Sequence, residues 1–147
     1  EYSPATTAAP SNPGLKATWY DFKGKTCAEI AAAPVKKTYR VEDVTIPRGV
    51  KSFIIGLTYK GYINIPEDGI YSFYLSSDDG SMLYIDGKQV IDNDGLHAPG
   101  EVTGQAALKQ GYHPIEVQYF DHGGGSINLK VCDNNGKEMP FTYLYAH

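Results

Sequence analysis

With 147 residues, of which 41% are hydrophobic and 20% are charged, the chain has the length and composition of one globular domain. Its formal net charge is −4, and its lysines and arginines are scattered along the sequence, which argues against a nucleic-acid partner. No apolar run approaches the about 20 residues of a membrane-spanning helix, so we expect no membrane insertion.

The first segment, residues 1–13, reads EYSPATTAAPSNP. It is rich in Ser, Thr, Ala and Pro and has almost no large aliphatic side chains, so it cannot bury enough apolar surface to order itself. We predict that residues 1–13 form a flexible linker between domains and that residues 14–147 form the folded domain.

Residues 15–22, with the sequence LKATWYDF and the only tryptophan, form a predicted strand. Thr26 is followed three residues later by Glu29, which is the spacing of a capping box, and residues 28–33 favour a short helix. Pro34 would end that helix.

From Ser52 onward the hydrophobic residues alternate with a period of two. The runs at residues 71–76, 115–119 and 127–131 each bury one face of a strand, and turns rich in glycine, aspartate and asparagine separate the runs. The pattern predicts an all-β fold, an antiparallel β-sandwich or β-barrel. The lack of crossover helices excludes a parallel α/β fold.

Asp86 and Gly87 lie between two hydrophobic runs, residues 82–85 and 89–91. Because aspartate and glycine tolerate positive φ, this pair predicts a two-residue type I′ turn. The two runs would then form a β-hairpin.

Two cysteines, Cys27 and Cys132, lie near opposite ends of the chain. If the first and last strands are neighbours, a disulfide would close the fold and stabilise it by about 4 kcal/mol through loop entropy. The alternative is two separately buried thiols, because a free cysteine packs like a small hydrophobic residue. The sequence leaves both open.

The stretch from Ser76 to Gly95, SSDDGSMLYIDGKQVIDNDG, is rich in aspartate and in turn glycines. Its adjacent carboxylates, Asp78 and Asp79, lie at the entrance to the predicted hairpin. They suggest a hard cation, because Ca²⁺ takes several oxygen ligands from loops that can bend around it. The alternative is that Asp78 accepts backbone hydrogen bonds within a tight turn.

Several long motifs occur in a fixed order. They are Trp19-Tyr20, YKGYI at residues 59–63, PEDGIYSFY at residues 66–74, the aspartate-rich stretch, and YFD with three glycines at residues 119–125. Over residues 14–132 the chain resembles the PA-fourteen domain family, named for the N-terminal segment of anthrax protective antigen. The resemblance implies a β-barrel-like sandwich that recurs as an accessory module in bacterial glycoside hydrolases and as the lectin head of fungal flocculins.

A narrower likeness comes from the motifs DNDGLH and KQGYHPI and from the tail with KEMP and YLY. They resemble the C-terminal PA-fourteen module of bacterial β-N-acetylhexosaminidases, and the linker at residues 1–13 agrees with such a tether. The resemblance implies a non-catalytic carbohydrate-binding module of a secreted, periplasmic or cell-surface protein. Its partners would be a glycan and a neighbouring catalytic domain in the same polypeptide.

The resemblance also implies a metal site. In the flocculin-type lectins of this family, two adjacent aspartates joined by a cis peptide bind Ca²⁺, which in turn receives two sugar hydroxyls. Asp78 and Asp79 stand at the positions of that pair, so Ca²⁺ is the expected cofactor. The third ligand in those lectins is an asparagine on a later loop, where this chain has the oxygen donor Asp121.

Four further residues are candidate carbohydrate contacts: Asn93, Asp94, His97 and His122. Asn93 and Asp94 belong to a second oxygen-rich loop, which is either a rim of the same site or a solvated turn. His122 is a poor Ca²⁺ ligand, and none of the four histidines has the spacing of a zinc site. The glycines at residues 123–125 would let their loop approach the aspartate pair closely.

We do not expect catalysis within this chain. Glycoside hydrolysis needs two carboxyl groups about 5 Å or more apart on either side of the bond, which adjacent aspartates on one turn rarely achieve. Among the twelve tyrosines, Tyr20, Tyr62 and Tyr112 are the better exposed candidates for sugar stacking. Two other functions stay open: a structural module that packs on a catalytic domain without binding glycan, and the head domain of an adhesin.

Overall fold

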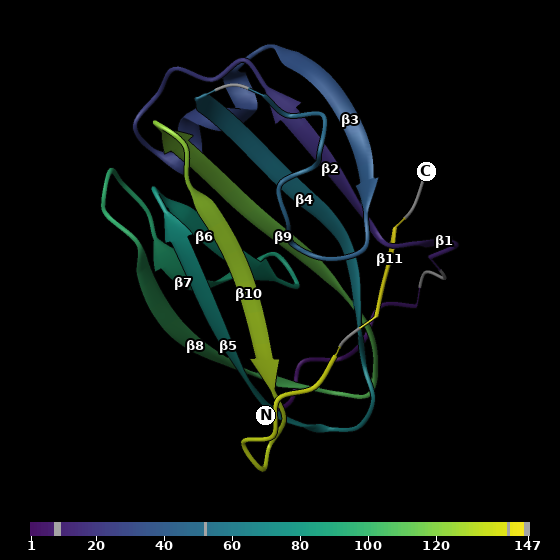
Figure 1. Cartoon of the computed structure of the whole chain (residues 1–147). Helices are drawn as coiled ribbons and strands as arrows, with labels where there is room; N and C mark the ends of the chain where they lie inside the picture. Colours follow the sequence, from purple (N-terminus) through teal and green to yellow (C-terminus); the bar gives the residue numbers. More distant parts are fainter. Residues whose placement is uncertain (8–9, 52, 141, 146–147) are drawn as a thin grey trace.

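The computed structural model describes residues 1–7, 10–51, 53–140 and 142–145 and consists of two antiparallel β-sheets packed face to face (Figure 1). The larger sheet has the order β1 (Asn12–Pro13), β11 (Tyr143–Tyr145), β4 (Ile54–Ile65), β9 (Gly111–His122), β6 (Ser81–Ile85) and β7 (Lys88–Asn93). Beside β4, this sheet also contains β2 (Leu15–Tyr20) and its neighbour β3 (Val35–Val41). The smaller sheet has the order β10 (Ser126–Cys132), β5 (Gly69–Asp78) and β8 (Gly100–Leu108). The predicted antiparallel β-sandwich is confirmed.

The main core lies between the two sheets and is built by the strands whose sequences alternate. Each strand turns every second side chain inward, and the inward side chains of the three predicted runs are buried. They are Tyr71, Phe73 and Leu75 on β5, Ile115, Val117 and Tyr119 on β9, and Ile127, Leu129 and Val131 on β10. Each fully buried side chain of this kind contributes about 1.5–3 kcal/mol of hydrophobic stabilisation.

The pairing of β4 with β9 lies at the centre of the larger sheet. It runs without interruption from Ile54 opposite His122 to Ile65 opposite Gly111. On its other edge, β9 pairs with β6, where Ser81 lies opposite Tyr119. This register brings the chain just before β6 next to the end of β9, although the two segments lie far apart in the sequence.

The predicted hairpin is confirmed. β6 and β7 pair around Asp86 and Gly87, which have φ angles of 55° and 75°. Positive φ at both central residues defines the type I′ turn, whose twist matches that of the flanking strands.

The outer face of the larger sheet is covered at one end by a short 3-10 helix, η1 (Cys27–Ala32). Cys27 and Ile30 pack there with Phe22, Met82 and Phe120 in a second buried cluster. Met82 and Phe120 alternate with core residues on β6 and β9, so they point away from the main core.

The predicted helix at residues 28–33 is therefore present as 3-10 helix that begins one residue earlier. The Thr26 side chain makes no cap hydrogen bond. Its hydroxyl instead donates to Glu29 Oε1 over 2.9 Å. The part of the predicted capping box in which the Thr26 side chain caps the helix is thus replaced by a contact between the Thr26 and Glu29 side chains.

The structure decides between the two alternatives for the cysteines. Cys27 and Cys132 are both buried and free, so the alternative of two separate thiols is confirmed and that of a disulfide is wrong. Burial raises the pKa of the Cys27 thiol, which keeps it protonated and unreactive.

Part of the predicted linker lies against the domain. The amide of Ser3 donates to the Ala107 carbonyl and that of Thr6 to the Tyr112 carbonyl, both over 2.9 Å. Strand β1 joins the larger sheet, whereas residues 8 and 9 lie outside the described ranges. The role of residues 1–13 as a tether stays a prediction. Among the residues that the structure describes, no helix has the length and apolar character needed to cross a membrane.

Candidate functional site

Asp78 and Asp79 lie where the chain crosses from one sheet to the other. Asp78 ends β5 in the smaller sheet, and β6 begins in the larger sheet three residues later. The peptide bond between the two aspartates is cis, as the resemblance implied. The amide of Asp79 donates to the Phe120 carbonyl (3.1 Å), and the amide of Phe120 donates to the Gly80 carbonyl (3.0 Å). These bonds fix the crossing against the end of β9.

The carboxylate of Asp79 binds two loops. Its Oδ1 accepts a hydrogen bond from the amide of His97 (3.0 Å), and its Oδ2 accepts one from the amide of His122 (2.9 Å). Each carboxylate oxygen can accept a second partner, so both retain a free lone pair. Asp79 therefore both holds the loops together and keeps oxygen-donor capacity.

Asp121 is a buried carboxyl group at the end of β9, with 1% of its surface exposed. Its Oδ2 lies 2.7 Å from the hydroxyl of Tyr119, and its Oδ1 accepts a hydrogen bond from the amide of Gly124 (3.2 Å). Burial raises the pKa of Asp121, although these hydrogen bonds oppose the shift, and the nearby charge of Asp79 raises the pKa further.

The side chain of Asp78 is the least engaged of the three. It is partly exposed and accepts no hydrogen bond from any described residue. Its carbonyl oxygen accepts the Tyr119 hydroxyl (2.9 Å) and faces the α-carbon of Gly125, where a β-carbon would overlap with it. The close approach predicted from the glycines at residues 123–125 is therefore present. We call Asp78, Asp79 and Asp121 the aspartate corner.

Within the described ranges, no three His, Cys, Asp or Glu side chains are grouped closely enough to form a complete metal site. The aspartate corner therefore offers carboxylate oxygens from two loops without a closed cage. Further oxygen donors for an ion would have to come from backbone carbonyls, water or a ligand.

The second oxygen-rich loop makes internal contacts. The amide group of Asn93 donates to the carbonyls of Leu75 (3.3 Å) and Gly100 (3.1 Å), which joins β7 to β5 and β8. Asp94 Oδ1 accepts the amide of Cys27 (2.9 Å) and so caps the start of η1. The structure thus gives both residues a structural role, and a sugar contact by either stays a prediction.

Both candidate histidines also bind carbonyl groups. His97 lies with Nδ1 2.7 Å from the Ala98 carbonyl oxygen and Nε2 2.8 Å from that of Asn93. Burial lowers the pKa of His97, but the two carbonyls and the nearby charges of Asp79 and Asp78 together raise it above its usual value. His122 Nε2 lies 2.6 Å from the Gly24 carbonyl oxygen, and its ring packs edge-on against Phe120. Both rings brace the loops that Asp79 holds, and their contact with sugar stays a prediction.

A family model described as the PA14 domain matches residues 11–143, which is nearly the whole chain. The chain belongs to the PA14 domain family. The family resemblance found in the sequence is confirmed, and the two packed sheets are this family's fold.

Two curated relatives of this PA14 domain are much longer proteins. A beta-hexosaminidase from Porphyromonas gingivalis is 36% identical over 77 residues, which cover 52% of this chain and 9% of the relative. An alpha-agarase from Thalassotalea agarivorans is 41% identical over 68 residues, which cover 46% of this chain and 4% of the relative. The matched segments thus span less than a tenth of these relatives.

Solved structures share the fold at low sequence identity. A PA14 sugar-binding domain from an RTX adhesin has a TM-score of 0.77 at 18% identity, covering 93% of this chain and all of that one. The epithelial adhesin 6 A domain from Candida glabrata, solved in complex with Galb1-3GlcNAc, has a TM-score of 0.64 at 10% identity, covering 96% of this chain and 89% of that one. These similarities establish the fold of this PA14 domain.

One residue beside the corner has no counterpart in the sequence prediction. Phe53 is 76% exposed, and its carbonyl accepts a hydrogen bond from the amide of Gly124 (3.2 Å) in the loop after Asp121. A pocket of about 290 Å³ lies here, with Phe53, Asp121 and Gly124 among its lining residues. An exposed phenylalanine in a loop has no periodic pattern, so the sequence alone did not mark it.

Proposed function

We propose that this PA14 domain is a non-catalytic carbohydrate-binding module of a larger glycoside hydrolase, and that it binds sugar at the aspartate corner with the help of Ca²⁺. The two curated relatives carry glycoside hydrolase names, and each is more than ten times as long as the segment it shares with this chain. The RTX adhesin neighbour is described as sugar-binding, which supports a carbohydrate ligand.

The observation that carries this proposal is the unpartnered carboxylate of Asp78 beside the oriented carboxylate of Asp79. Hard cations such as Ca²⁺ prefer oxygen ligands from loops, and both side chains keep free lone pairs. Asp78, Asp79 and Asp121 would hold the ion, together with backbone carbonyls. When bound, Ca²⁺ would offer open coordination positions to sugar hydroxyl groups.

Phe53 adds an apolar surface to this site. Sugar rings have faces of C–H groups, which pack well on an exposed aromatic ring. Phe53 is 76% exposed, so its ring leaves apolar surface in contact with water, and a ligand that covered this surface would gain hydrophobic stabilisation. We therefore assign Phe53 as a stacking position at the rim of the corner.

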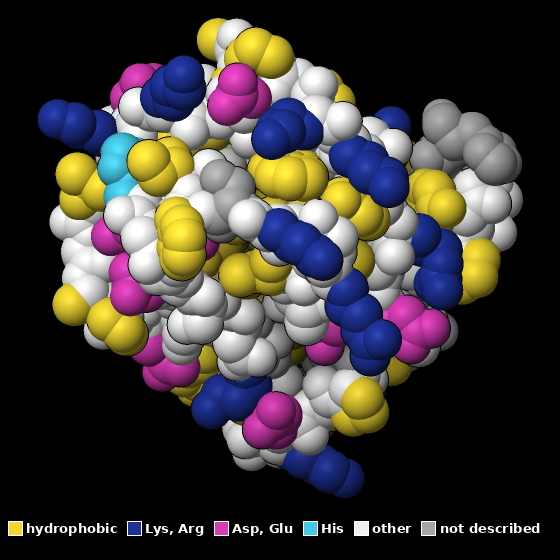
Figure 2. Space-filling view, turned by 45° about the horizontal axis from the view of Figure 1, so that its top comes forward, with side chains coloured by type: hydrophobic (Ala, Val, Ile, Leu, Met, Phe, Trp, Pro, Cys, Tyr) yellow, Lys and Arg dark blue, Asp and Glu magenta, His cyan; other side chains and the backbone are white. Residues whose placement is uncertain are grey.

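A module that only docks on a catalytic domain is less well supported. On the face in Figure 2, hydrophobic side chains stand among lysine, arginine and other polar side chains. The large exposed hydrophobic residues of the described chain, such as Val35, Phe53 and Leu96, come from separate segments. Stable docking interfaces need a broader apolar patch than such scattered side chains provide.

The proposal is tested by glycan array and isothermal titration calorimetry, with and without a chelator. We expect binding to a subset of glycans that is lost on chelation and restored by added Ca²⁺. Asp79→Asn should abolish that binding, whereas Glu138→Gln, an exposed acidic residue beyond the far end of β10, should leave it unchanged. Absence of binding to all glycans, with a melting temperature that chelation does not alter, would overturn both the lectin and the calcium assignments.

A further inference from the structure

The outer face of the larger sheet has an open groove that is separate from the aspartate corner. Its volume is about 610 Å³, within the range of small-molecule binding sites. Helix η1 and the second buried cluster beneath it cover one end of this sheet face. The groove lies on the part of the face that remains open. Asp121 in the corner lies five positions after Glu116 in the groove on β9, which corresponds to about 17 Å along the strand.

The groove is built by a row of residues in register across four strands. Lys16 on β2 lies opposite Lys60 on β4, Lys60 lies opposite Glu116 on β9, and Glu116 lies opposite Tyr84 on β6. All four line the groove. Because facing residues in adjacent strands point to the same side of a sheet, the charged groups form its floor.

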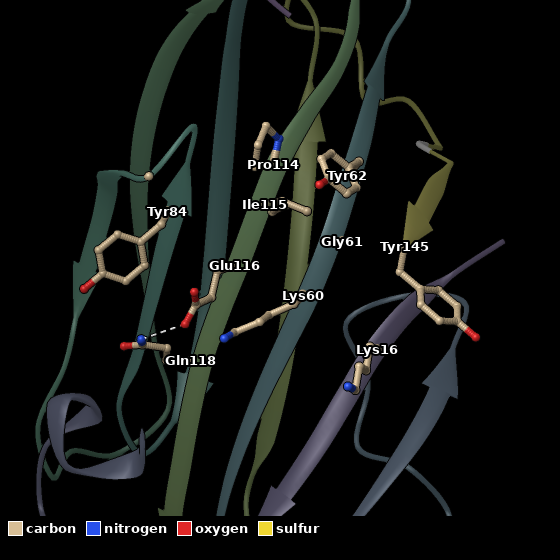
Figure 3. Close-up of a pocket in the computed structure, with 11 residues that line it drawn as sticks. Lys16, Lys60, Gly61, Tyr62, Tyr84, Pro114, Ile115, Glu116, Gln118 and Tyr145 are labelled. Atoms are coloured by element: carbon tan, nitrogen blue, oxygen red, sulfur yellow. Dashed lines mark hydrogen bonds between the residues drawn. The ribbon is translucent and has the colours of Figure 1, made fainter. Parts of the chain in front are cut away.

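Tyrosine rings stand on both sides of this floor. Figure 3 shows Tyr84 on one side and Tyr62 and Tyr145 on the other, with Lys60 and Glu116 between them. Two strand spacings, about 10 Å, separate Tyr84 from Tyr62 across the sheet. The arrangement offers aromatic faces on either side of a polar centre.

The floor of the groove carries more positive than negative charge. Gln118 donates a hydrogen bond to the Glu116 carboxylate over 2.9 Å (Figure 3). In the described chain, neither Lys16 nor Lys60 forms an ion pair. Two free ammonium groups and one carboxylate thus face the groove in a chain whose formal net charge is −4.

This chemistry does not suit a protein partner. The centre of a protein interface is depleted in charged residues, since burying an unpaired charge costs several kcal/mol. Docking of another domain here would bury Lys16 and Lys60 without partners. A ligand with apolar ring faces, many hydroxyl groups and its own negative charges satisfies both the tyrosines and the lysines.

We propose that this groove is a second glycan site, which binds an extended acidic polysaccharide across the strands without Ca²⁺. Tyr62 and Tyr84 stack against sugar rings, Lys16 and Lys60 bind carboxylate or sulfate groups, and Glu116 and Gln118 bind hydroxyl groups. The inference rests on the proposed function only in that the ligand is a glycan. The residues of the groove and those of the corner are different.

The test is affinity electrophoresis in gels that contain a chelator and one soluble polymer. Polygalacturonate supplies carboxylates, carrageenan supplies sulfates, and hydroxyethyl cellulose is the neutral comparison. We expect an acidic polymer to retard the protein. The acidic polymer that causes the greater retardation shows whether the groove binds carboxylate or sulfate groups. Tyr84→Ala and Lys60→Gln should each weaken the binding about tenfold, equivalent to about 1.4 kcal/mol. Added salt should weaken it further, because exposed charge contacts are screened.

A matched pair of controls lies on the smaller sheet, where Lys130 stands 4.6 Å from the ring centre of Tyr74. Tyr74→Ala and Lys130→Gln should leave retardation unchanged, and so should Asp79→Asn, which separates this site from the corner. Thermal melts identify any variant that fails to fold. Tyr62→Ala removes the second stacking ring and should weaken the binding as Tyr84→Ala does. The proposal would be overturned if the neutral polymer retarded the protein equally, if no retardation occurred in the gels that contain chelator, or if the control variants lost as much binding as Tyr84→Ala and Lys60→Gln.

Discussion

The hydroxyl oxygen of Tyr119 lies 2.7 Å from Oδ2 of Asp121, and the same oxygen lies 2.9 Å from the carbonyl oxygen of Asp78. A tyrosine hydroxyl has one proton, so it cannot donate to both acceptors. Both contacts become hydrogen bonds when Asp121 is protonated and donates to Tyr119, which then donates to Asp78. Burial, which raises the pKa of Asp121, favours this protonated form.

The first prediction concerns how stability depends on pH. Because the pKa of Asp121 is higher in the folded state than in the unfolded state, the stability that this group contributes is fully present below about pH 4, the ordinary aspartate pKa. It is lost as the pH rises through the folded pKa. Asp121→Asn cannot ionise, so urea unfolding of both proteins should show the wild type losing stability relative to the variant as pH rises. A relative gain of the wild type over this range would contradict the prediction.

Calcium should reverse this trend if it binds at the aspartate corner. An ion needs Asp121 in its ionised form, so apparent affinity should increase as pH rises through the folded pKa of that group. The shift in melting temperature caused by added Ca²⁺ measures this effect at each pH. Asp78→Asn should remove the shift, and a Ca²⁺ effect that persists in this variant would place the ion elsewhere.

A third prediction concerns the close contact between Gly125 and Asp78. Gly125→Ala would force a β-carbon against the Asp78 carbonyl oxygen, so the loop or the corner must move. We expect a loss of about 1–3 kcal/mol in the free energy of unfolding, typical of overpacking, together with loss of sugar binding. Gly100→Ala is the control, because the nearest atom to its β-carbon would be the Ala98 oxygen at 3.7 Å. Equal stability of the two variants in urea unfolding would show that the loop at residues 123–125 relaxes freely.

The architecture was predictable because local sequence determines it. Alternation with a period of two marked the core strands, and Asp86 with Gly87 marked the hairpin turn, since both signals arise from residues next to one another. The 3-10 form of η1 was not predictable from the same kind of signal. Its buried residues pack against Met82 and Phe120, which come from β6 and β9 and lie far away in the sequence.

The sites were predictable only in part. The motif around Asp78 and Asp79 marked the corner, but its bonds join segments far apart in sequence, such as Asp79 with His122, 43 residues later. The groove has no local motif at all. Tyr84, Glu116 and Lys60 come together only through the registers of β6, β9 and β4, which no short stretch of sequence encodes.

The last prediction concerns Asp86 and the buried His113, which meet at the opposite end of the hairpin from the corner. His113 is fully buried, with Nδ1 3.0 Å from both carboxylate oxygens of Asp86 and Nε2 2.7 Å from the Lys109 carbonyl oxygen. Each ring nitrogen of His113 thus lies within hydrogen-bond distance of an oxygen atom. Asp86 also accepts the Ser3 hydroxyl (2.7 Å), so the pair ties the N-terminal segment to the hairpin.

Asp86→Asn should therefore destabilise the fold by about 1–3 kcal/mol, because it removes the carboxylate that partners a ring nitrogen of the buried His113. Asparagine tolerates positive φ, so the turn itself should survive the change. The measurement is urea unfolding of Asp86→Asn, His113→Gln and the double variant. The double variant should lose less than the sum of the single changes, because the two residues act as one unit. Additive losses would mean that the two side chains contribute independently and that their contact does not stabilise the fold.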